Sequence, residues 1–414
     1  SNGASATALR FGAGATTPEI RNSGTVEAKG GNSETARSTA IAIDAGANVG
    51  TIRNSGAIKA TASGENGSAT AIVDRSGTTT LIENSGAISA TGAKADSGRN
   101  IAIDLSANTT GVTVKQTQVG AGITAPLIEG DIRLGTGNDV LDVADGAFKG
   151  AAHFAAGNNT YALSGDAVHT GSVVFGAGND TMTLAGTSIF SGTADFGGGS
   201  DTLSIGGTAV FSGSLVNSAN LAVNVTGGAL DINKPASIAS LTVGASGTLA
   251  VTLDKAADAG TAFNVSGTAS FAKDATLAVR LADVSNAEGS YVVVQAGTLE
   301  GADGIKVRSD LVPFLFKAEV AEDAGPNQIV IDVARRTTQE LGLNRSQATA
   351  FDAVFAAIGE DAEIGQIFLG ITDGDHFRHS VRQMLPDHAG AAFEGVSLGT
   401  RAFARQVADP PSPV

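Results

Sequence analysis

Apolar and polar residues alternate over short runs along roughly the first 250 residues of the chain. Residues 181–184 (Thr-Met-Thr-Leu) and 202–205 (Thr-Leu-Ser-Ile) are two such runs. Alternation of this kind buries one face of a strand and leaves the other in water. Gly- and Asn-rich segments separate the runs, so the pattern predicts many short strands joined by tight turns.

An internal repeat sets the spacing of the strands in the first part of the chain. Asn-Ser-Gly triplets begin at Asn22, Asn54 and Asn84, at intervals of 32 and 30 residues. Asn and Gly tolerate left-handed backbone, so each triplet predicts a turn between two strands. The long period predicts one coil plus an outward loop, such as residues 63–67.

From about residue 130 the period shortens to about 21 residues. Phe154, Phe175 and Phe196 keep this interval, as do Phe190 and Phe211. Gly-initiated turns follow it with spacings of 20, 21 and 21 residues: Gly137, Gly157, Gly178 and Gly199. A coil of this length advances by one strand spacing of ~4.8 Å, so equivalent residues should stack and the Phe rings should form internal ladders.

These repeats predict a mostly β protein whose main part is a right-handed parallel β-helix. Residues 1–270 would form about twelve to fourteen coils. A tandem of β-sandwiches is the alternative, but it would not require identical turns at identical spacing.

The pattern changes twice after residue 260. Strands become longer and more apolar, as in 290–294 (Ser-Tyr-Val-Val-Val) and 311–316 (Leu-Val-Pro-Phe-Leu-Phe). An open β-helix end exposes unpaired strand edges, so we expect this stretch to be a cap. It would be the most stable unit of the chain, and it would act as the template on which the coils fold.

Helical spacing replaces the strands after residue 335. Apolar residues at i, i+3, i+4 and i+7 predict helices over 351–358 and 364–371. Asn344 with Gln347 predicts an N-terminal cap, and Gly359 predicts the end of the first helix. Phe377, Val381 and Leu385 mark a third helix ended by Pro386, and a fourth is expected over about 389–408.

Five segments are therefore predicted. They are a β-helix with ~30-residue repeats (1–130), a β-helix with ~21-residue repeats (131–260), a C-terminal cap (261–335), an α-helical linker separable from the rod (336–408) and a Pro-rich tail (409–414).

Composition excludes several classes of function. The 414 residues include 55 Gly and no Cys or Trp, and the formal net charge is −15. A chain without Cys has no disulfide, thiolate metal site or Cys nucleophile. Strong negative charge disfavours binding to nucleic acid and favours a soluble monomer. No stretch approaches the ~18 apolar residues of a membrane helix, and both ends look like cuts from a longer precursor.

The order of these parts resembles the passenger domain of an autotransporter, the type V secretion system of Gram-negative bacteria. Residues 289–299 and 327–336 are similar to the end of pertactin-like passengers, whose corresponding region is an autochaperone. Residues 384–388 (Met-Leu-Pro-Asp-His) and 397–402 (Ser-Leu-Gly-Thr-Arg-Ala) resemble the segment before the translocator.

The resemblance implies transit through the periplasm and a final place at the cell surface, in the outer membrane or in the medium. The implied partners are the chain's own C-terminal β-barrel translocator, which is absent from this sequence, the outer-membrane assembly machinery, and an unknown ligand on a host, cell or matrix surface. We expect a non-enzymatic adhesin or structural surface rod without cofactors. The alternatives are a stalk for an upstream enzyme module and a polysaccharide-active β-helix. Two Tyr and no Trp leave few surfaces for stacking sugars, which disfavours the latter.

Three groups of residues are candidate sites. Asp139, Asp180 and Asp201 occupy turns that resemble calcium-binding nonapeptides, but Asn159 interrupts their column and the motif occurs once per coil, which favours plain Asx turns. Ser397 fits a Gly-x-Ser-x-Gly nucleophile motif, but no His follows it.

The third group contains the candidate metal ligands Asp373, Asp375, His376 and His379. We expect Asp375 to cap a helix there instead, with both His residues partly solvated. His153 and His169 are expected at the surface. No catalytic, cofactor or metal residue is therefore predicted.

Overall fold

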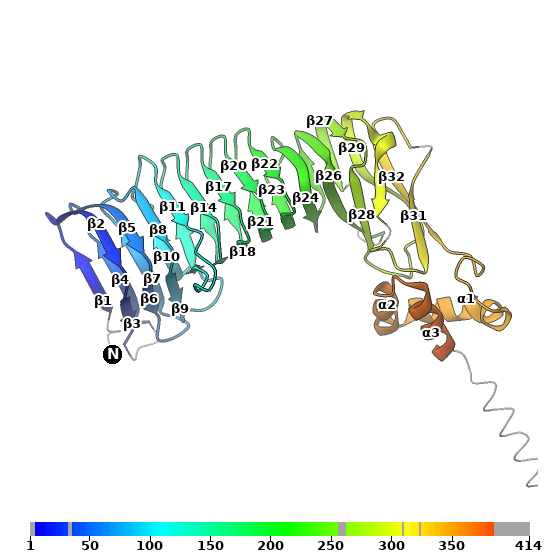
Figure 1. Ribbon diagram of the computed structural model, residues 1–414, viewed down its shortest axis with the longest axis horizontal. Helices are drawn as coiled ribbons and strands as arrows, with labels where there is room; N and C mark the ends of the chain where they lie inside the picture. Colours follow the sequence, from blue (N-terminus) through cyan, green and yellow to red (C-terminus); the bar gives the residue numbers. More distant parts are fainter. Residues whose placement is uncertain (1–4, 32–34, 256–261, 309, 323, 385–414) are drawn as a thin grey trace, which may run out of the picture. The chain divides into compact units, whose positions relative to one another are not determined.

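The computed structural model describes residues 5–31, 35–255, 262–308, 310–322 and 324–384. Its larger compact unit comprises 1–280, 289–309 and 318–332, and a smaller one comprises 281–288, 310–317 and 333–414. The larger unit is a parallel β-helix, as the repeats predicted. Successive coils follow the chain from blue to yellow in Figure 1, and equivalent strands of neighbouring coils pair in parallel.

Three columns of strands form the β-helix. The first contains β1 (Ala6–Phe11), β4 (Arg37–Ile43), β7 (Ser68–Asp74), β10 (Asn100–Asp104), β13 (Asp131–Arg133), β16 (Ala152–His153) and β19 (Val173–Val174). The second contains β2 (Thr16–Asn22), β5 (Asn48–Asn54), β8 (Leu81–Asn84), β11 (Thr113–Gln116), β14 (Val140–Val143), β17 (Thr160–Leu163), β20 (Thr181–Leu184) and β22 (Thr202–Ile205). The third contains β3 (Thr25–Lys29), β6 (Ala57–Thr61), β9 (Ala87–Thr91), β12 (Leu127–Glu129), β15 (Ala147–Lys149) and β18 (Val168–Thr170).

Later strands are longer because several of them turn a corner and pair in two columns. β24, for example, pairs through Ala222–Val225 with β22 and through 229–232 with β23. These strands are β21 (Ile189–Asp195), β23 (Val210–Val216), β24 (Ala222–Ile232), β25 (Ala236–Ile238), β26 (Ser240–Leu253), β27 (Phe263–Phe271), β28 (Thr276–Leu281), β29 (Gly289–Glu300), β30 (Lys306–Arg308), β31 (Phe316–Val320) and β32 (Gln328–Arg335).

The core is a set of apolar columns that run from coil to coil. One continuous series of paired residues in the second column is Ile20, Ile52, Ile82, Val114, Leu141, Tyr161, Met182, Leu203, Val223, Leu241, Ala269 and Leu299. Eleven of them precede residue 270, where twelve to fourteen coils were expected. The number is smaller because the long spacing persists to the step from Val114 to Leu141 and returns between Leu241 and Ala269. The predicted outward loop is present, as at 62–67 between β6 and β7.

The predicted Phe ladders are confirmed. Phe154, Phe175 and Phe196 are 0–5% exposed, and their rings stack with centroids 5.0 and 5.5 Å apart. Phe190 and Phe211 stack in the same way at 4.9 Å. Residues at the 21-residue interval are therefore in direct ring contact between successive coils.

The smaller unit packs its helices around Phe377. The ring centroid of Phe377 lies 5.7–6.4 Å from those of Phe314, Phe351 and Phe368. Within the described residues, the helical elements are the 3-10 helix η1 (Ala302–Gly304) in the larger unit and α1 (Arg345–Glu360), α2 (Ala362–Leu369) and α3 (Gly374–Met384) in the smaller one. The predicted cap of α1 is confirmed as a reciprocal pair of hydrogen bonds between Asn344 and Gln347.

Several details of this unit differ from the sequence expectations. Gly359 does not end α1, which continues to Glu360; a Cβ at Gly359 would lie 3.2 Å from Ser285, so the glycine permits close packing there. Ile367 is 60% exposed, because α2 turns Gly365 and Phe368 inward instead.

The apolar stretch 311–316 is not the expected strand, although its final residue begins β31. It forms turns around Pro313, which has no N–H for a ladder. The third predicted helix is confirmed up to Met384, whereas Leu385, the fourth helix and the Pro-rich tail lie outside the described residues.

Candidate functional site

The Asn-Ser-Gly turns build an internal ladder of side-chain amides. Asn22 Nδ2 donates to Asn54 Oδ1 and Asn54 Nδ2 donates to Asn84 Oδ1, both at 2.8 Å. Asn84 Nδ2 continues the ladder to Gln116 Oε1 at 3.2 Å. Asn54, Asn84 and Gln116 are at most 2% exposed. The ladder therefore links four successive coils along the rod.

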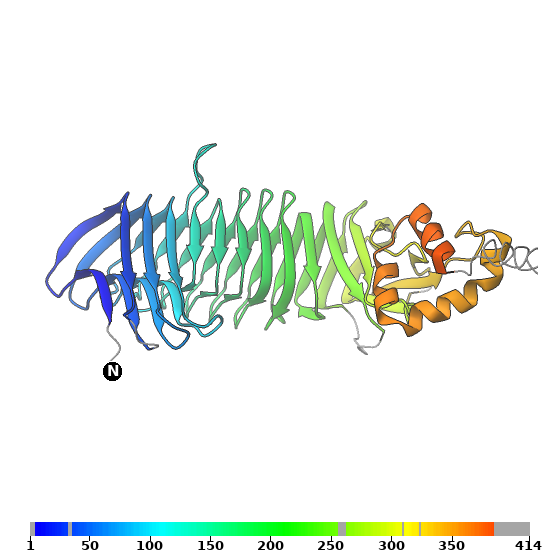
Figure 2. The same ribbon diagram turned by 90° about the horizontal axis from the view of Figure 1, so that it is seen from below.

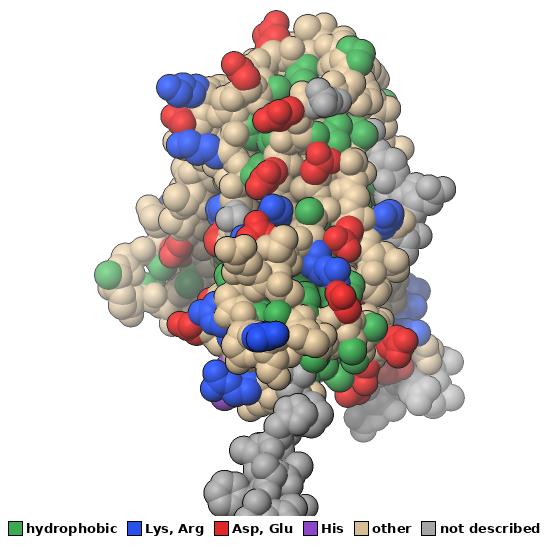
Figure 3. Space-filling view, turned by 90° about the vertical axis from the view of Figure 1, so that its right-hand side faces the viewer, with side chains coloured by type: hydrophobic (Ala, Val, Ile, Leu, Met, Phe, Trp, Pro, Cys, Tyr) green, Lys and Arg blue, Asp and Glu red, His purple; other side chains and the backbone are tan. Residues whose placement is uncertain are grey.

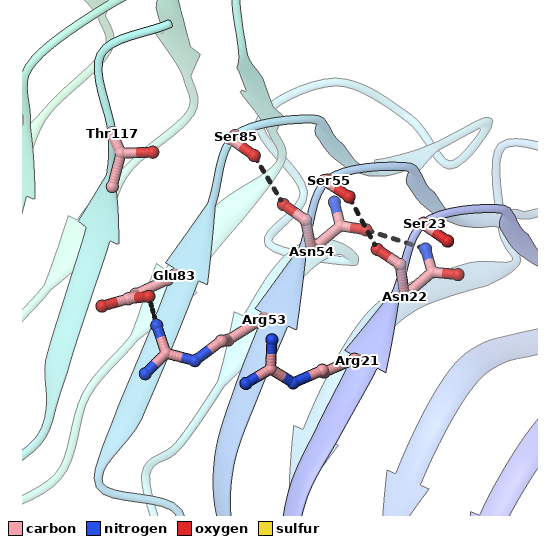
Figure 4. A pocket seen from close by; sticks show the side chains of 9 residues that line it. All are labelled: Arg21, Asn22, Ser23, Arg53, Asn54, Ser55, Glu83, Ser85 and Thr117. Atoms are coloured by element: carbon pink, nitrogen blue, oxygen red, sulfur yellow. Dashed lines mark hydrogen bonds and ion pairs between the residues drawn. The ribbon is translucent and has the colours of Figure 1, made fainter.

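The serines of the same turns face outward, because the preceding amide occupies the interior. Beside them lies a groove of about 380 Å³, shown in Figure 4. Its lining is Arg21, Asn22, Ser23, Arg53, Asn54, Ser55, Glu83, Ser85 and Thr117. Hydroxyl and amide groups therefore recur along one edge of the rod at intervals of one coil, beside two guanidinium groups and one carboxylate.

Charged side chains form a connected row along this groove. Arg21 Nε lies 2.6 Å from a Glu19 carboxylate oxygen, and Arg53 bridges Glu19 and Glu83. The hydrogen bond from Arg21, with a further one from Arg53, lowers the pKa of Glu19 below its usual range. The Arg21 side chain is 75% exposed, so it can exchange Glu19 for another anion at little cost.

One end of the groove adjoins a projecting loop. Gln116 occupies the place of the ladder Asn, but the turn after it is extended over 117–126 before β12 begins. This segment projects from the coils in Figure 2, and its Ile123 is 63% exposed. Val119 N donates to Asp145 Oδ2 at 2.8 Å and anchors the base of the loop.

The residues expected to form Asx turns build a second side-chain ladder, which runs from coil to coil. Asp139 Oδ1 accepts a hydrogen bond from Val112 N at 2.8 Å, and Asn159 Oδ1 accepts one from Asp139 N at 3.0 Å. Asp180 and Asp201 repeat the arrangement, accepting from the main-chain N–H of Asn159 and Asp180 at 2.7 and 2.8 Å. All four side chains are 1–3% exposed.

These carboxylates therefore accept hydrogen bonds from the main chain of the preceding coil, 21 to 27 residues away, so they form neither the expected Asx turns nor an open ligand shell. In the part of the chain that the structure describes, no three His, Cys, Asp or Glu side chains gather as metal ligands. Burial raises the pKa of Asp139 to about 6 and also raises the pKa values of Asp180 and Asp201.

His169 is buried, not exposed as expected, whereas His153 is half-buried. It takes a place in an aromatic column between Phe148, stacked at 4.2 Å, and Phe190 at 5.1 Å. Its Nε2 lies 2.9 Å from the Gly150 carbonyl, which can only accept, so Nε2 carries the proton. Nδ1 then accepts from the Tyr161 hydroxyl at 2.7 Å. The imidazole is therefore a neutral, fully bonded part of the core.

Acid should destabilise the rod through His169. Burial lowers the pKa of His169 to about 4 from an ordinary 6.5. Between these values the unfolded chain binds a proton that the folded chain does not, so stability is retained above pH 6.5 and lost as pH falls towards 4, by about 3 kcal/mol. Replacing His169→Phe together with Tyr161→Phe should remove this part of the pH dependence of urea unfolding. An unchanged slope between pH 6.5 and 4 would contradict the assignment.

The remaining candidate residues do not form a site. Asp373, not Asp375, caps α3 by accepting from His376 N at 2.8 Å, because the helix begins at Gly374 and includes Asp375. Asp375 pairs with Arg378, and His379 contacts Gln383. Ser397 lies outside the described residues.

Comparison with protein-family models, curated proteins and solved structures finds no match to this chain. Each helix in the described ranges is too short or too polar to span a lipid bilayer. The candidate site is therefore the groove beside the Asn ladder, argued from its own chemistry. Sequence reasoning placed the turns but missed the groove; the regular recurrence of Asn-Ser pairs was the signal that could have found it.

Proposed function

We propose that this chain is a non-enzymatic autotransporter passenger of a Gram-negative bacterium, displayed on the cell or secreted, and that it acts as an adhesin or surface rod. The observation that carries this proposal is the order of parts: a long parallel β-helix, then β29 and β32 with the passenger-like residues 289–299 and 327–336, then a helical unit. A β-helix suits adhesion because equivalent groups recur along its side at each coil.

The groove beside the Asn ladder is the proposed contact surface. It offers repeated hydrogen-bonding and charged groups but no aromatic ring, so its ligand would be held by polar contacts. Figure 3 views the molecule from the right-hand side of Figure 1, and acidic and basic side chains are interspersed on that face as well. An extended polar ligand lying along the rod would meet a similar set of groups at successive coils.

Replacing Arg53→Gln should weaken adhesion about tenfold or more, because it removes a charge-assisted hydrogen-bonding group from the centre of the groove. The measurement is binding of the purified chain to a panel of immobilised matrix proteins and glycans. Arg53 forms partly exposed ion pairs, so thermal unfolding should hardly change.

Arg75→Gln is the matched control, since Arg75 pairs with Asp44 and does not line the groove. Equal binding by both variants and the unaltered chain would remove the groove from the proposal.

Surface display requires a separate test. Antibodies raised against the purified chain should label intact cells of the bacterium that makes it, and external protease should abolish that labelling. The secreted form should instead be recovered from the medium. Signal only after cell lysis would contradict both forms of the proposal.

A further inference from the structure

The Asx ladder contains buried carboxylate oxygens that the surrounding structure leaves without a donor. Asp139 Oδ2 and Asp180 Oδ2 are out of reach of solvent and have no hydrogen-bond partner among the described residues. Their other oxygens, Oδ1, each accept a main-chain N–H. An unpaired acceptor at such depth is costly, so these two atoms need an explanation.

Asn159, which lies between them in the same column, shows what the site requires. Its Oδ1 makes the same ladder contact as the two Asp residues. Its Nδ2 donates to the carbonyls of Gly157 and Ala155, at 3.1 and 3.4 Å. In this turn, the site of Nδ2 faces two main-chain carbonyl oxygens, so a hydrogen-bond donor fits there.

The same carbonyls recur in the other turns, two and four residues before each Asp. For Asp139 they belong to Gly137 and Gly135, and for Asp180 to Gly178 and Gly176. The turns are stacked in register, since Gly157 N donates to Ala177 O and Gly178 N donates to Gly198 O. A carboxylate there would face other acceptors, whereas a carboxylic acid would supply the donor that Asn159 supplies.

The charges around the column do not favour ionisation. The stacked turns 108–112, 135–139, 155–159, 176–180 and 197–201 contain no Lys, Arg or His. Burial raises the pKa of Asp180 and the Asp201 carboxylate raises it further, whereas hydrogen bonds from the main chain and side chain of Asn159 lower it. Asp195 Oδ1 accepts a hydrogen bond from Gly197 N of the last turn at 2.9 Å. The other charged or titratable side chains near the turns form no hydrogen bond with them in the described structure: Asp131, Arg133, Asp142 and His153.

We propose that Asp139 and Asp180 take up protons in the folded rod at mildly acidic pH and donate hydrogen bonds to the carbonyls of their own turns, so that acid tightens this part of the β-helix. Each step transfers one proton from water to Oδ2 and breaks no covalent bond. The device is independent of the proposed adhesion, because the column is buried and shares no residue with the lining of the groove.

The sign of the effect follows from linkage. The pKa of Asp139 is about 6 in the folded chain, against an ordinary 3.8. The folded chain therefore binds the proton more tightly, and its stabilising contribution is complete below about pH 3.8 and lost as pH rises through about 6. Asp180 acts in the same direction. The effect of pH on stability through His169 has the opposite sign, so the contribution of the column must be tested by comparing variants at equal pH.

The decisive measurement is thermal unfolding of the full chain and of Asp139→Asn, Asp180→Asn and the double variant, from pH 8 to pH 4.5 in EDTA. An amide supplies the donor at every pH, so the variants should melt several degrees higher than the unaltered chain at pH 8. The difference should vanish by about pH 4.5, where the carboxylic acids donate equally. Asn159 shows that the column accepts an amide without misfolding.

Asp166→Asn is the matched control, because Asp166 is exposed in the same part of the rod and its replacement changes the net charge equally. Its effect on melting should be small and should lack the transition near pH 6. Variants that melt no higher than the unaltered chain at pH 8, or a difference that does not vary with pH, would overturn the proposal. So would a rise in the melting temperature of the unaltered chain on adding Ca²⁺ at pH 8 that both variants lack, since a cation would then fill the space assigned to the proton.

Discussion

Replacing Phe175→Ala is expected to destabilise the β-helix by about 3–5 kcal/mol, the range for truncating a fully buried Phe. The Phe175 ring is 2% exposed and stacks between Phe154 and Phe196. Its loss would open a cavity in the middle of the ladder and remove two ring contacts. The stacked coils cannot close that cavity, because main-chain hydrogen bonds fix their spacing.

Urea unfolding followed by circular dichroism measures this effect. Ile189→Ala is the control, since Ile189 lies in the same part of the rod but is 43% exposed. We expect it to change the free energy of unfolding by less than about 1 kcal/mol. Similar losses in both variants would show that the Phe ladder does not carry the stability of these coils.

Replacing Gly171→Ala should be comparably severe, by about 3 kcal/mol or more, although it adds a single methyl group. Gly171 has φ of +146°, which disfavours any residue with a Cβ, and an added Cβ would lie 2.0 Å from the Gly150 carbonyl oxygen. Glycines recur at this corner in successive coils: Gly130, Gly150, Gly171, Gly192 and Gly213. Relief of the clash at one coil would displace the next.

Gly198→Ala provides the control for the same change, because nothing lies within 4 Å of the position of its Cβ and its φ is not in the left-handed region. It should lower the melting temperature only slightly. If Gly171→Ala melted as Gly198→Ala does, the close approach of the coils would not limit the sequence at this corner.

Periodicity in the sequence was sufficient for the architecture because a solenoid repeats the same local contacts. The interval between Phe154, Phe175 and Phe196 predicted both the coil length and the ring contacts. The capping pair Asn344 and Gln347 was equally predictable, because both partners lie within one turn of chain.

The candidate site was harder to predict because the direction of a side chain decides it. An Asn-Ser-Gly triplet predicts a turn whether the amide points inward or outward, so the ladder through Asn54 and the groove beside it were missed. His169 was misplaced although the interval from Phe148 to Phe190 already contained it. His169 was expected at the surface because it is polar, whereas its burial is decided by its place in a column of aromatic residues.

The sequence pattern also could not predict which segments distant along the chain contact one another. The smaller unit includes 281–288 and 310–317 as well as the helices, and Phe314 of the second segment packs on Phe377. Both segments belong to the stretch assigned to the cap. Their apolar character was evident from sequence, but their partners are fixed by tertiary packing over separations of more than sixty residues.

The amide ladder also affects how the β-helix would respond to a pull along its axis. Strands of a β-helix run across the rod, so the hydrogen bonds between coils lie along its length. A pull along that axis acts on the coils in series, and the weakest junction between two coils sets the breaking force. From Asn22 to Gln116, each junction has an extra side-chain bond parallel to the load. Separating two neighbouring coils between Asn22 and Gln116 would therefore require breaking a side-chain hydrogen bond in addition to the main-chain ones.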